Sequence, residues 1–186
     1  AELICEHGYS ATTNAQIGER AGFSRNMVRD RYGSKDEVLR DLIARTFESM
    51  LPVAPRAASG RERAVQLVDL VRRLALAEPE VQCALNIVTF EGAATAHPLA
   101  GVARSAITPF FDAIAAAMAE GVEDGSISPD VDIRTEVVLL RMCVVGYGFL
   151  DVAGLSSRSH AEHIEELCSD FAARLAPDPA GPRTPS

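Results

Sequence analysis

The chain has 186 residues, enough for one large domain or two small ones. Hydrophobic residues make up 47% of it, which excludes a disordered acidic protein, because such chains lack the apolar residues for a core. The sequence has no signal peptide pattern and no uncharged apolar run of about 18 residues, so we expect no membrane span and no membrane partner. The formal net charge of -8 argues at first against nucleic acid.

The charge is distributed unevenly along the chain. Residues 1–51 have seven basic and eight acidic side chains, whereas residues 52–186 have eleven basic and eighteen acidic ones. Within the first part, residues 20–35, here called the basic segment, contain one acidic residue and five basic ones, a local net charge of +4. The basic residues are Arg20, Arg25, Arg29, Arg31 and Lys35. A local patch determines the field that a close partner meets, so this segment favours DNA binding, with a solvated helix face as the alternative.

The cysteine pattern indicates a reduced protein. The four cysteines are Cys5, Cys83, Cys143 and Cys168. They are far apart, form no CxxC pair and stand in apolar helical contexts, where a free cysteine acts as a small hydrophobe. We therefore expect a cytoplasmic location.

Helical periodicity recurs along the chain, and no segment alternates like a strand. Four helix starts match the capping box, in which Ser or Thr precedes Glu or Gln by three residues. The pairs are Thr13 with Gln16, Ser34 with Glu37, Ser59 with Glu62, and Ser159 with Glu162. Each pair can satisfy two backbone amides at a helix start, so the sequence predicts an all-α protein.

The first 50 residues predict four helices. A short helix ends at Gly8, and a second runs from about Thr13 to Ala21. A third follows Ser24, its expected N-cap, and reaches about Tyr32, and a fourth runs from Ser34 to about Met50. The segment from Pro52 to Gly60 contains two prolines and is interpreted as a linker.

Longer helices are expected in the second part of the chain. They cover about 61–77, 79–95, the stretch opened by His97 and Pro98, 137–153 and 160–175. Pro109 should bend the third of these, and Asp130 or Asp132 can cap the fourth. The stretch 137–153 is apolar on nearly all sides, so we expect it to be buried on more than one face and, with the last helix, to form a dimer interface.

Two short helices joined at Gly22 form a helix-turn-helix pattern. Ile17, Ala21, Phe23 and Val28 can pack the two helices together, while Gly18 allows them to approach closely. The outward face of the second helix then carries Arg25, Asn26, Arg29 and Tyr32. Arginine suits guanine edges and asparagine suits adenine edges, so this face predicts DNA reading.

The same residues resemble a known family. The matching stretches are Gly8-Tyr9, Thr12-Thr13, Ile17, Glu19-Arg20-Ala21-Gly22-Phe23-Ser24 and Tyr32-Gly33-Ser34-Lys35-Asp36-Glu37-Val38-Leu39. Over about the first 45 residues they look like the DNA-binding domain of TetR-family transcriptional regulators. The rest of the chain resembles the family in architecture, as a helical domain of suitable length.

The resemblance implies a fold, a function and partners. It implies an N-terminal helix-turn-helix domain of about three helices over residues 1–45 and a helical effector-binding and dimerisation domain over 46–176. Residues 177–186 are expected to form a disordered tail. It further implies a homodimeric repressor that binds a near-palindromic double-stranded DNA operator and is released by a small-molecule effector.

The resemblance also assigns roles to residues. Base reading is expected at Arg25, Asn26 and Met27. Phosphate contacts are expected at Thr13, Ser24, Arg29, Tyr32 and Lys35. Position 26 is often Gly in the family and is Asn here, and position 29 is often Tyr and is Arg here, which puts the family's usual contacts in doubt at those two positions.

No catalytic constellation emerges, since no nucleophile motif such as GxSxG is present, and we expect neither an enzyme nor a cofactor. His160 and His163 lie one helical turn apart among glutamates, but a metal site needs ligands from facing helices as well. We therefore interpret them as an exposed first helical turn and expect no metal. His97 is interpreted as a turn residue and His7 as an exposed end.

An effector pocket should be mostly apolar with a few polar groups. The candidate lining residues are Cys83, Asn86, Thr89, Phe90, Phe110, Phe111, Met118, Met142 and Tyr147. Taken singly, each of them fits plain core better than a pocket. Few of the candidates can be charged, so we expect a mostly apolar effector. Glu91, an ionisable residue in an apolar helix, either belongs to this region or faces water. The rival hypothesis is a helical ligand carrier or enzyme with an incidental helix-turn-helix.

Overall fold

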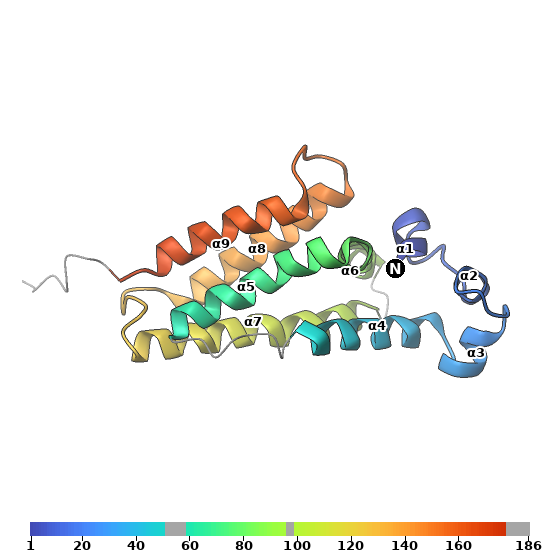
Figure 1. The fold of residues 1–186 in the computed structure, drawn as a ribbon, viewed down its shortest axis with the longest axis horizontal. Helices are drawn as coiled ribbons and strands as arrows, with labels where there is room; N and C mark the ends of the chain where they lie inside the picture. Colours follow the sequence, from blue (N-terminus) through green and yellow to red (C-terminus); the bar gives the residue numbers. More distant parts are fainter. Residues whose placement is uncertain (51–58, 96–98, 178–186) are drawn as a thin grey trace, which may run out of the picture. The chain divides into compact units, whose positions relative to one another are not determined.

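The structure is a computed structural model that describes residues 1–50, 59–95 and 99–177 (Figure 1). Within these ranges the chain is helical and contains no strand, which confirms the all-α prediction. The helices are α1 (Glu2–His7), α2 (Asn14–Arg20), α3 (Met27–Tyr32), α4 (Lys35–Met50), α5 (Gly60–Ala77), α6 (Pro79–Thr95), α7 (Leu99–Glu123), α8 (Ile133–Val152) and α9 (His160–Leu175). Of the helices described, none is both long and apolar enough to cross a bilayer.

Side-chain caps define at least five of the helix starts in the described residues. At α4 and α5 the amides of Glu37 and Glu62 donate to the hydroxyls of Ser34 and Ser59 at 3.3 and 3.2 Å, one half of each predicted capping box. Thr13 and Ser159 each form both halves of a capping box, with Gln16 at α2 and with Glu162 at α9. Asp132 caps α8 by accepting hydrogen bonds from the amides of the second and third residues of that helix. Of the two aspartates considered for this cap, Asp132 is therefore the one that forms it.

The chain packs into two compact units, each made of two stretches of sequence. The first unit combines residues 1–53 with 74–108, and the second combines 54–73 with 109–186. α6 therefore belongs to the same unit as the helix-turn-helix. The division within α7 falls at Pro109, where the ring removes a backbone donor from the helix. The predicted boundary at residue 45 stays a prediction.

The core of the first unit joins α1, α4 and α6. α1 packs against α6, which Figure 1 shows beside the N-terminus. The buried residues of this core are Ile4, Tyr9, Leu39, Ile43, Ala84 and Val88. Ala84 and Val88 are one helical turn apart on α6, so one face of that helix is covered by the N-terminal helices.

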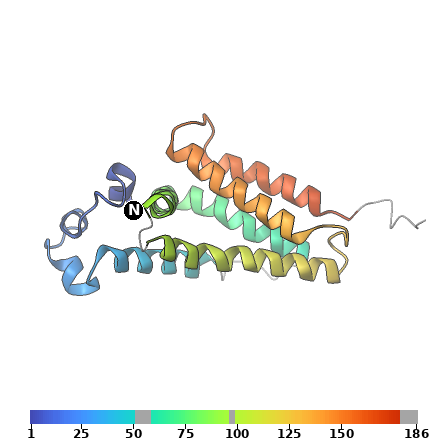
Figure 2. The same cartoon turned by 180° about the vertical axis from the view of Figure 1, so that it is seen from behind.

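The second unit is a bundle built from α5, α8, α9 and the second half of α7. α8 and α9 lie side by side in both views (Figures 1 and 2). Buried apolar residues recur at helical spacing on α9, at Ile164, Leu167, Phe171 and Leu175. The guanidinium of Arg61 on α5 donates to the carbonyl of Ala172 at 2.6 Å, which ties α5 to α9.

The start of α3 differs from the sequence prediction. The third helix was expected to follow directly on Ser24 as N-cap, and this is wrong. α3 begins at Met27, after a turn in which the Met27 amide donates to the Ser24 carbonyl at 3.0 Å. The 51–58 part of the proposed linker, His97 with Pro98, and the tail from residue 178 lie outside the described residues.

Gly60, the first residue of α5, provides a test of the packing in the second unit. A Cβ there would overlap the backbone of Gly121 and lie 2.5 Å from the Ala117 carbonyl oxygen on α7. We expect Gly60→Ala to lower the free energy of unfolding by about 1–3 kcal/mol through overpacking. Chemical denaturation at fixed protein concentration measures this.

Gly101 on α7 is the matched control, because a Cβ there meets no atom within 4 Å. Gly101→Ala should leave stability unchanged or raise it by up to about 1 kcal/mol, as alanine favours a helix over glycine. Equal denaturation midpoints for Gly60→Ala and Gly101→Ala would contradict the close approach of α5 to α7.

Candidate nucleic-acid interface

α2 and α3 pack together as the two helices of a helix-turn-helix. Gly18 is buried, and a Cβ on it would lie 2.5 Å from the Ser24 carbonyl oxygen, so the expected close approach at this glycine is present. Gly22 turns the chain with φ +76°, a left-handed conformation that glycine adopts without strain. Val28 is fully buried and anchors α3 against its neighbours.

The three residues expected to read bases lie at and just before the start of α3. Arg25 and Asn26 are exposed and occupy the turn, and Met27 is the first residue of the helix. The Arg25 side chain is 76% exposed, and its Nε donates to the Glu19 carboxylate of α2. This arrangement leaves the two Nη groups of Arg25 for other partners.

The residues expected to contact phosphate have different surroundings. Ser24 and Arg29 are exposed, and the guanidinium of Arg29 is 3.8 Å from the Asp30 carboxylate. Tyr32 is half-buried, with the Arg31 guanidinium 5.7 Å from its ring centre. The hydroxyl of Thr13 is engaged in the capping box of α2. Exposed Ser24 and Arg29 therefore lie just before and on α3, whereas exposed Thr13 begins α2.

Lys35 differs from the other candidates because its ammonium faces the protein. Nζ donates to the carbonyls of Tyr9 at 2.8 Å, Thr12 at 2.7 Å and Ser10 at 3.4 Å. It also lies 4.3 Å from the centre of the Tyr9 ring. Lys35 thus stabilises the loop between α1 and α2 in this structure, and its expected phosphate contact stays a prediction.

Tyr9 itself is buried and ties the same loop to α4. Its hydroxyl donates to the Asp36 carboxylate. Burial, together with this hydrogen bond to an acidic group, raises the pKa of Tyr9. Tyr9 therefore stays neutral and serves as a structural donor.

The Glu91 carboxylate on α6 binds the loop before α2, a contact that the sequence did not predict. It accepts hydrogen bonds from the backbone amides of Tyr9 and Ser10, each at 2.9 Å, and from the Ser10 hydroxyl at 2.7 Å. Glu91 thus faces the protein as a half-buried anchor. Its only sequence signal is an acidic residue in an otherwise apolar helix.

Arg20, at the N-terminal end of the basic segment, is largely neutralised. Its guanidinium forms ion pairs with Glu2 at 2.9 Å and Glu6 at 2.8 Å on α1. The hydrogen bond from Arg20 lowers the pKa of Glu6. The positive charge available to a partner is therefore concentrated at Arg25, Arg29 and Arg31.

The expected effector-pocket residues fall into the two units. In the first unit, the Asn86 side-chain oxygen accepts from Gln82 Nε2 at 3.1 Å, and its Nδ2 is buried without a hydrogen-bond partner. The Thr89 hydroxyl donates to the Leu85 carbonyl, and Cys83 and Phe90 are half-buried. Of these four candidates, Asn86 is the one with a buried donor that no group in the described residues accepts.

In the second unit the candidates have three kinds of surroundings. Phe111 and Met118 are fully buried core residues, and Phe110 packs edge-on against Phe111 with ring centres 5.3 Å apart. Tyr147 stacks on the His163 ring at 4.6 Å. Met142 is 64% exposed on α8, which fits a surface contact better than a pocket wall.

A hollow of about 380 Å³ lies within the first unit, away from these candidates. It is lined by residues of α1, α2 and α4 and by Glu78, Glu80 and Val81, and none of the nine expected pocket residues contributes to it. Its two cations, Arg20 and Lys35, are already paired with acidic and carbonyl groups of the protein. Neither cation of this hollow is therefore free to bind an anionic ligand.

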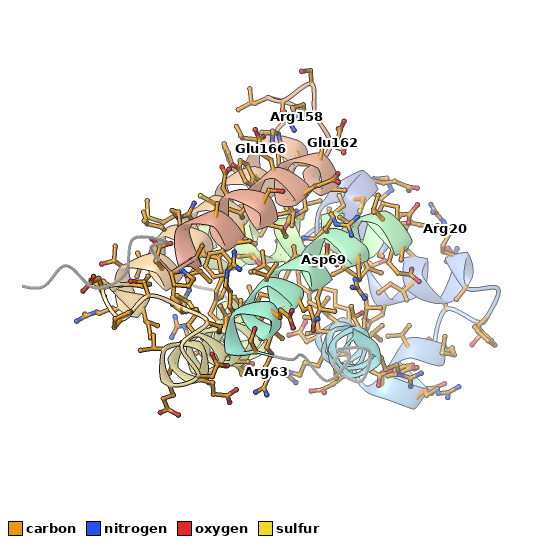
Figure 3. The ribbon with its side chains drawn as sticks, turned by 60° about the vertical axis from the view of Figure 1, so that its left-hand side comes forward. Arg20, Arg63, Asp69, Arg158, Glu162 and Glu166 are labelled. Atoms are coloured by element: carbon orange, nitrogen blue, oxygen red, sulfur yellow. The ribbon has the colours of Figure 1, made fainter. Side chains whose placement is uncertain are left out.

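The histidine pair at the start of α9 was expected to be exposed, and this is wrong. His160 is only 4% exposed, and burial lowers its pKa. His163 Nε2 is 2.8 Å from the Ser156 hydroxyl. Nearby, Arg158 pairs with Glu166 at 2.6 Å, beside Glu162 (Figure 3). Among the residues that the structure describes, no three potential metal ligands come together.

Comparison with known proteins supports the assignment of the N-terminal helices. The sequence model of the family described as "Bacterial regulatory proteins, tetR family" matches residues 1–42. This match covers α1, α2, α3 and the first half of α4, the segment that contains the helix-turn-helix. Over residues 1–42 the chain is therefore similar to the helix-turn-helix domain of TetR-family regulators.

Solved structures extend the similarity in fold to nearly the whole chain. A TetR transcription regulator from Haloarcula marismortui is 20% identical with a TM-score of 0.75, covering 94% of this chain and 93% of the other. FadR from Bacillus subtilis, in complex with stearoyl-CoA, is 13% identical with a TM-score of 0.75 and covers 94% of both chains.

FadR from Thermus thermophilus, a TetR-family transcriptional repressor in complex with lauroyl-CoA, is 22% identical with a TM-score of 0.61. It covers 99% of this chain and 95% of the other. At these identities the TetR proteins share the fold with this chain. No curated protein sequence matches the chain.

Lys35 gives a test of the loop geometry. Lys35→Met should lower the free energy of unfolding by about 1–3 kcal/mol, because the carbonyls of Tyr9 and Thr12 lose a charged donor in a partly buried site. Thermal and urea denaturation measure the change. Arg31→Met, an exposed basic residue of the same segment, is the control and should stay within about 0.5 kcal/mol of wild type. Equal stability of the two variants would leave Lys35 free for the phosphate contact.

Proposed function

We propose that the chain is a ligand-responsive transcriptional regulator, a homodimeric repressor that leaves a palindromic operator when a small, mostly apolar molecule binds. The observation that carries the proposal is the exposed cluster of Arg25, Arg29 and Arg31 around α3 on an otherwise acidic chain. Base reading by Arg25, Asn26 and Met27 supplies specificity, since arginine and asparagine match guanine and adenine edges. The protein acts in the cytoplasm, where bacterial DNA is, and performs no catalysis.

Affinity comes from phosphate contacts near the same surface. Arg29 and Ser24 are exposed beside the base-reading residues, and Thr13 begins the helix that supports them. Each phosphate contact releases about one counterion, so affinity falls steeply with salt. The acidic remainder of the chain limits the electrostatic attraction of DNA to other surfaces.

The proposed dimer interface is one face of α8. Five large apolar residues are exposed on this helix. They are Val138, Leu139, Met142, Phe149 and Val152, here called the α8 stripe. Met142, Phe149 and Val152 follow Val138 by about one, three and four helical turns, so these four share one face with Gly146, and Leu139 lies at the edge of that face. A second copy of the same stripe would cover these side chains across a two-fold axis.

The proposed effector is an apolar molecule with a polar end. The similar FadR structures contain stearoyl-CoA and lauroyl-CoA, molecules with a long acyl chain. In this chain the buried Asn86 Nδ2 offers a donor among apolar neighbours on α6. Lauroyl-CoA should release the protein from DNA, and coenzyme A alone is the control; equal release by both would refute an apolar effector.

Release requires a difference in affinity between two conformations of the dimer. Successive major grooves present half-sites about 34–36 Å apart, so a small rotation of the recognition helices breaks the match. Moving the population from 1:99 to 99:1 requires about 5.5 kcal/mol of differential effector affinity. We expect the recognition-helix spacing to differ between structures with and without effector.

Arg25 tests base reading. Arg25→Ala should cost about 1–3 kcal/mol of operator affinity and relax preference at one base pair per half-site. Arg29→Ala is the comparison, because loss of a phosphate contact weakens all sequences and lowers the salt slope by about 1 per half-site. Fluorescence anisotropy with selected and scrambled DNA over a salt series separates the two effects. Equal loss on both DNAs for Arg25→Ala would overturn its assigned role.

Met142 tests the dimer. Met142→Asp places a charge in the centre of the α8 stripe and should convert dimer to monomer at micromolar concentration, because an unpaired charge is strongly disfavoured in an apolar interface. Leu76→Asp, at a similarly exposed leucine on α5, is the control and should leave the dimer intact. Sedimentation velocity distinguishes them. A wild-type protein that sediments as a monomer would remove the dimer from the proposal.

A gel shift with the DNA that flanks the protein's own gene separates regulation from the rival function of a ligand carrier with an incidental helix-turn-helix. A regulator forms a discrete complex that survives excess random DNA. Selection from a random pool then defines the bound site. Failure to enrich any site would favour the rival.

A further inference from the structure

The loop between α1 and α2 is attached to α6 through a single carboxylate. Each oxygen of Glu91 has its own partners: Oε1 accepts from the Tyr9 amide at 2.9 Å, and Oε2 accepts from the Ser10 amide at 2.9 Å and hydroxyl at 2.7 Å. These residues are more than 80 positions apart in the sequence. The carboxylate thus accepts three hydrogen bonds from the loop that precedes the helix-turn-helix.

The absence of a side chain at Gly8 leaves space for the Glu91 carboxylate. A Cβ at Gly8 would lie 2.5 Å from Oε1 of Glu91, closer than real Cβ contacts allow. Gly8 also has φ +80°, which side chains rarely adopt. The backbone can therefore come close enough for both amides to bind Glu91 because residue 8 has no side chain.

Lys35 binds the backbone carbonyls of the same loop, whereas Glu91 binds its backbone amides. Its ammonium binds the carbonyls of Tyr9, Ser10 and Thr12, while Glu91 binds the amides of Tyr9 and Ser10. Burial raises the pKa of Glu91, but the hydrogen bonds from Ser10 and Tyr9 and the charge of Lys35 outweigh it, and the pKa lies below its ordinary value. Glu91 is therefore ionised at neutral pH, as the three donors require.

The clamped loop leads directly into the DNA-binding helices. Thr12 is buried, and its hydroxyl donates to the carbonyl of Gly8 at 2.7 Å. The next residue, Thr13, is the N-cap of α2, and α2 packs against α3. The position of the loop therefore sets where α2 starts. Because α3 packs on α2, the loop also sets the orientation of α3.

We propose that Glu91 is a positioning residue for DNA binding: from α6, outside the segment that matches the family, it holds the loop before α2 and so sets the direction in which α3 meets DNA. The proposal rests on the proposed function, because it assumes that α3 binds DNA. It adds a residue of the effector-binding part of the sequence to those on which operator recognition depends.

The test compares Glu91→Gln with Glu80→Gln on the DNA site that the wild-type chain selects from a random pool. Both changes remove one negative charge from α6, but Glu80 is exposed in its first turn. Loss of negative charge alone strengthens DNA binding. Glu91→Gln should nevertheless weaken binding to the selected site about tenfold, the equivalent of one charge-assisted hydrogen bond, whereas Glu80→Gln should not weaken it.

Half-site spacing provides a readout that a general loss of stability would not change. Sites with one base pair added or removed at the centre should bind the wild type much more weakly than the selected site. In Glu91→Gln the difference in affinity between the selected site and the altered sites should become smaller, because a loosely held α2–α3 pair can bind half-sites at several spacings. A proportional loss on all spacings and on random DNA would mean that Glu91 only stabilises the fold, and would overturn the proposal.

Ser10→Ala is the second variant, used if Glu91→Gln fails to fold by circular dichroism. It removes one of the three donors to Glu91 and keeps both amides. A smaller reduction of the same affinity difference is expected, and an unchanged spacing preference would overturn the proposal. If the wild type selects no site at all, the proposed function fails; if it selects a site and both variants bind as wild type does, only the role of Glu91 fails.

Discussion

The first unit of this chain depends on a negative and a positive side chain that bind the same short stretch of backbone. Residues 8–12 contribute amides to Glu91 and carbonyls to Lys35, and Tyr9 inserts its buried ring between α1 and α4. Short helices such as α1, α2 and α3 gain little stability on their own. Fixing the loop that connects them lets six- and seven-residue helices hold a defined geometry.

Local chemistry made most of the helices predictable, and long-range pairing made the loop unpredictable. Thr13 with Gln16 and Ser159 with Glu162 are close in sequence, so their capping boxes could be recognised in advance. Glu91 and Tyr9 are 82 residues apart, and no periodicity links them. The late start of α3 has a local cause: a turn at Ser24 satisfies the Met27 amide before the helix begins.

The candidate sites show the same contrast. The charge and side-chain types of the basic segment predicted a DNA-facing region, but they could not separate cations that face outward from those engaged within the protein, such as Arg20 and Lys35. On α8 the sequence is apolar nearly all round, and only packing against α9 shows which side remains uncovered. The exposure of Met142 and the burial of His160 both follow from that packing.

Under the proposed function, the contact between Arg25 and Glu19 has a consequence for how the protein searches DNA. At a random sequence the guanidinium can remain on its own carboxylate, so the sliding protein presents one cation fewer than its composition suggests. A site that offers guanine acceptors competes with Glu19 for the same group. The intramolecular pair thus acts as a threshold: it weakens residence on the many wrong sites and leaves the right one to draw Arg25 away.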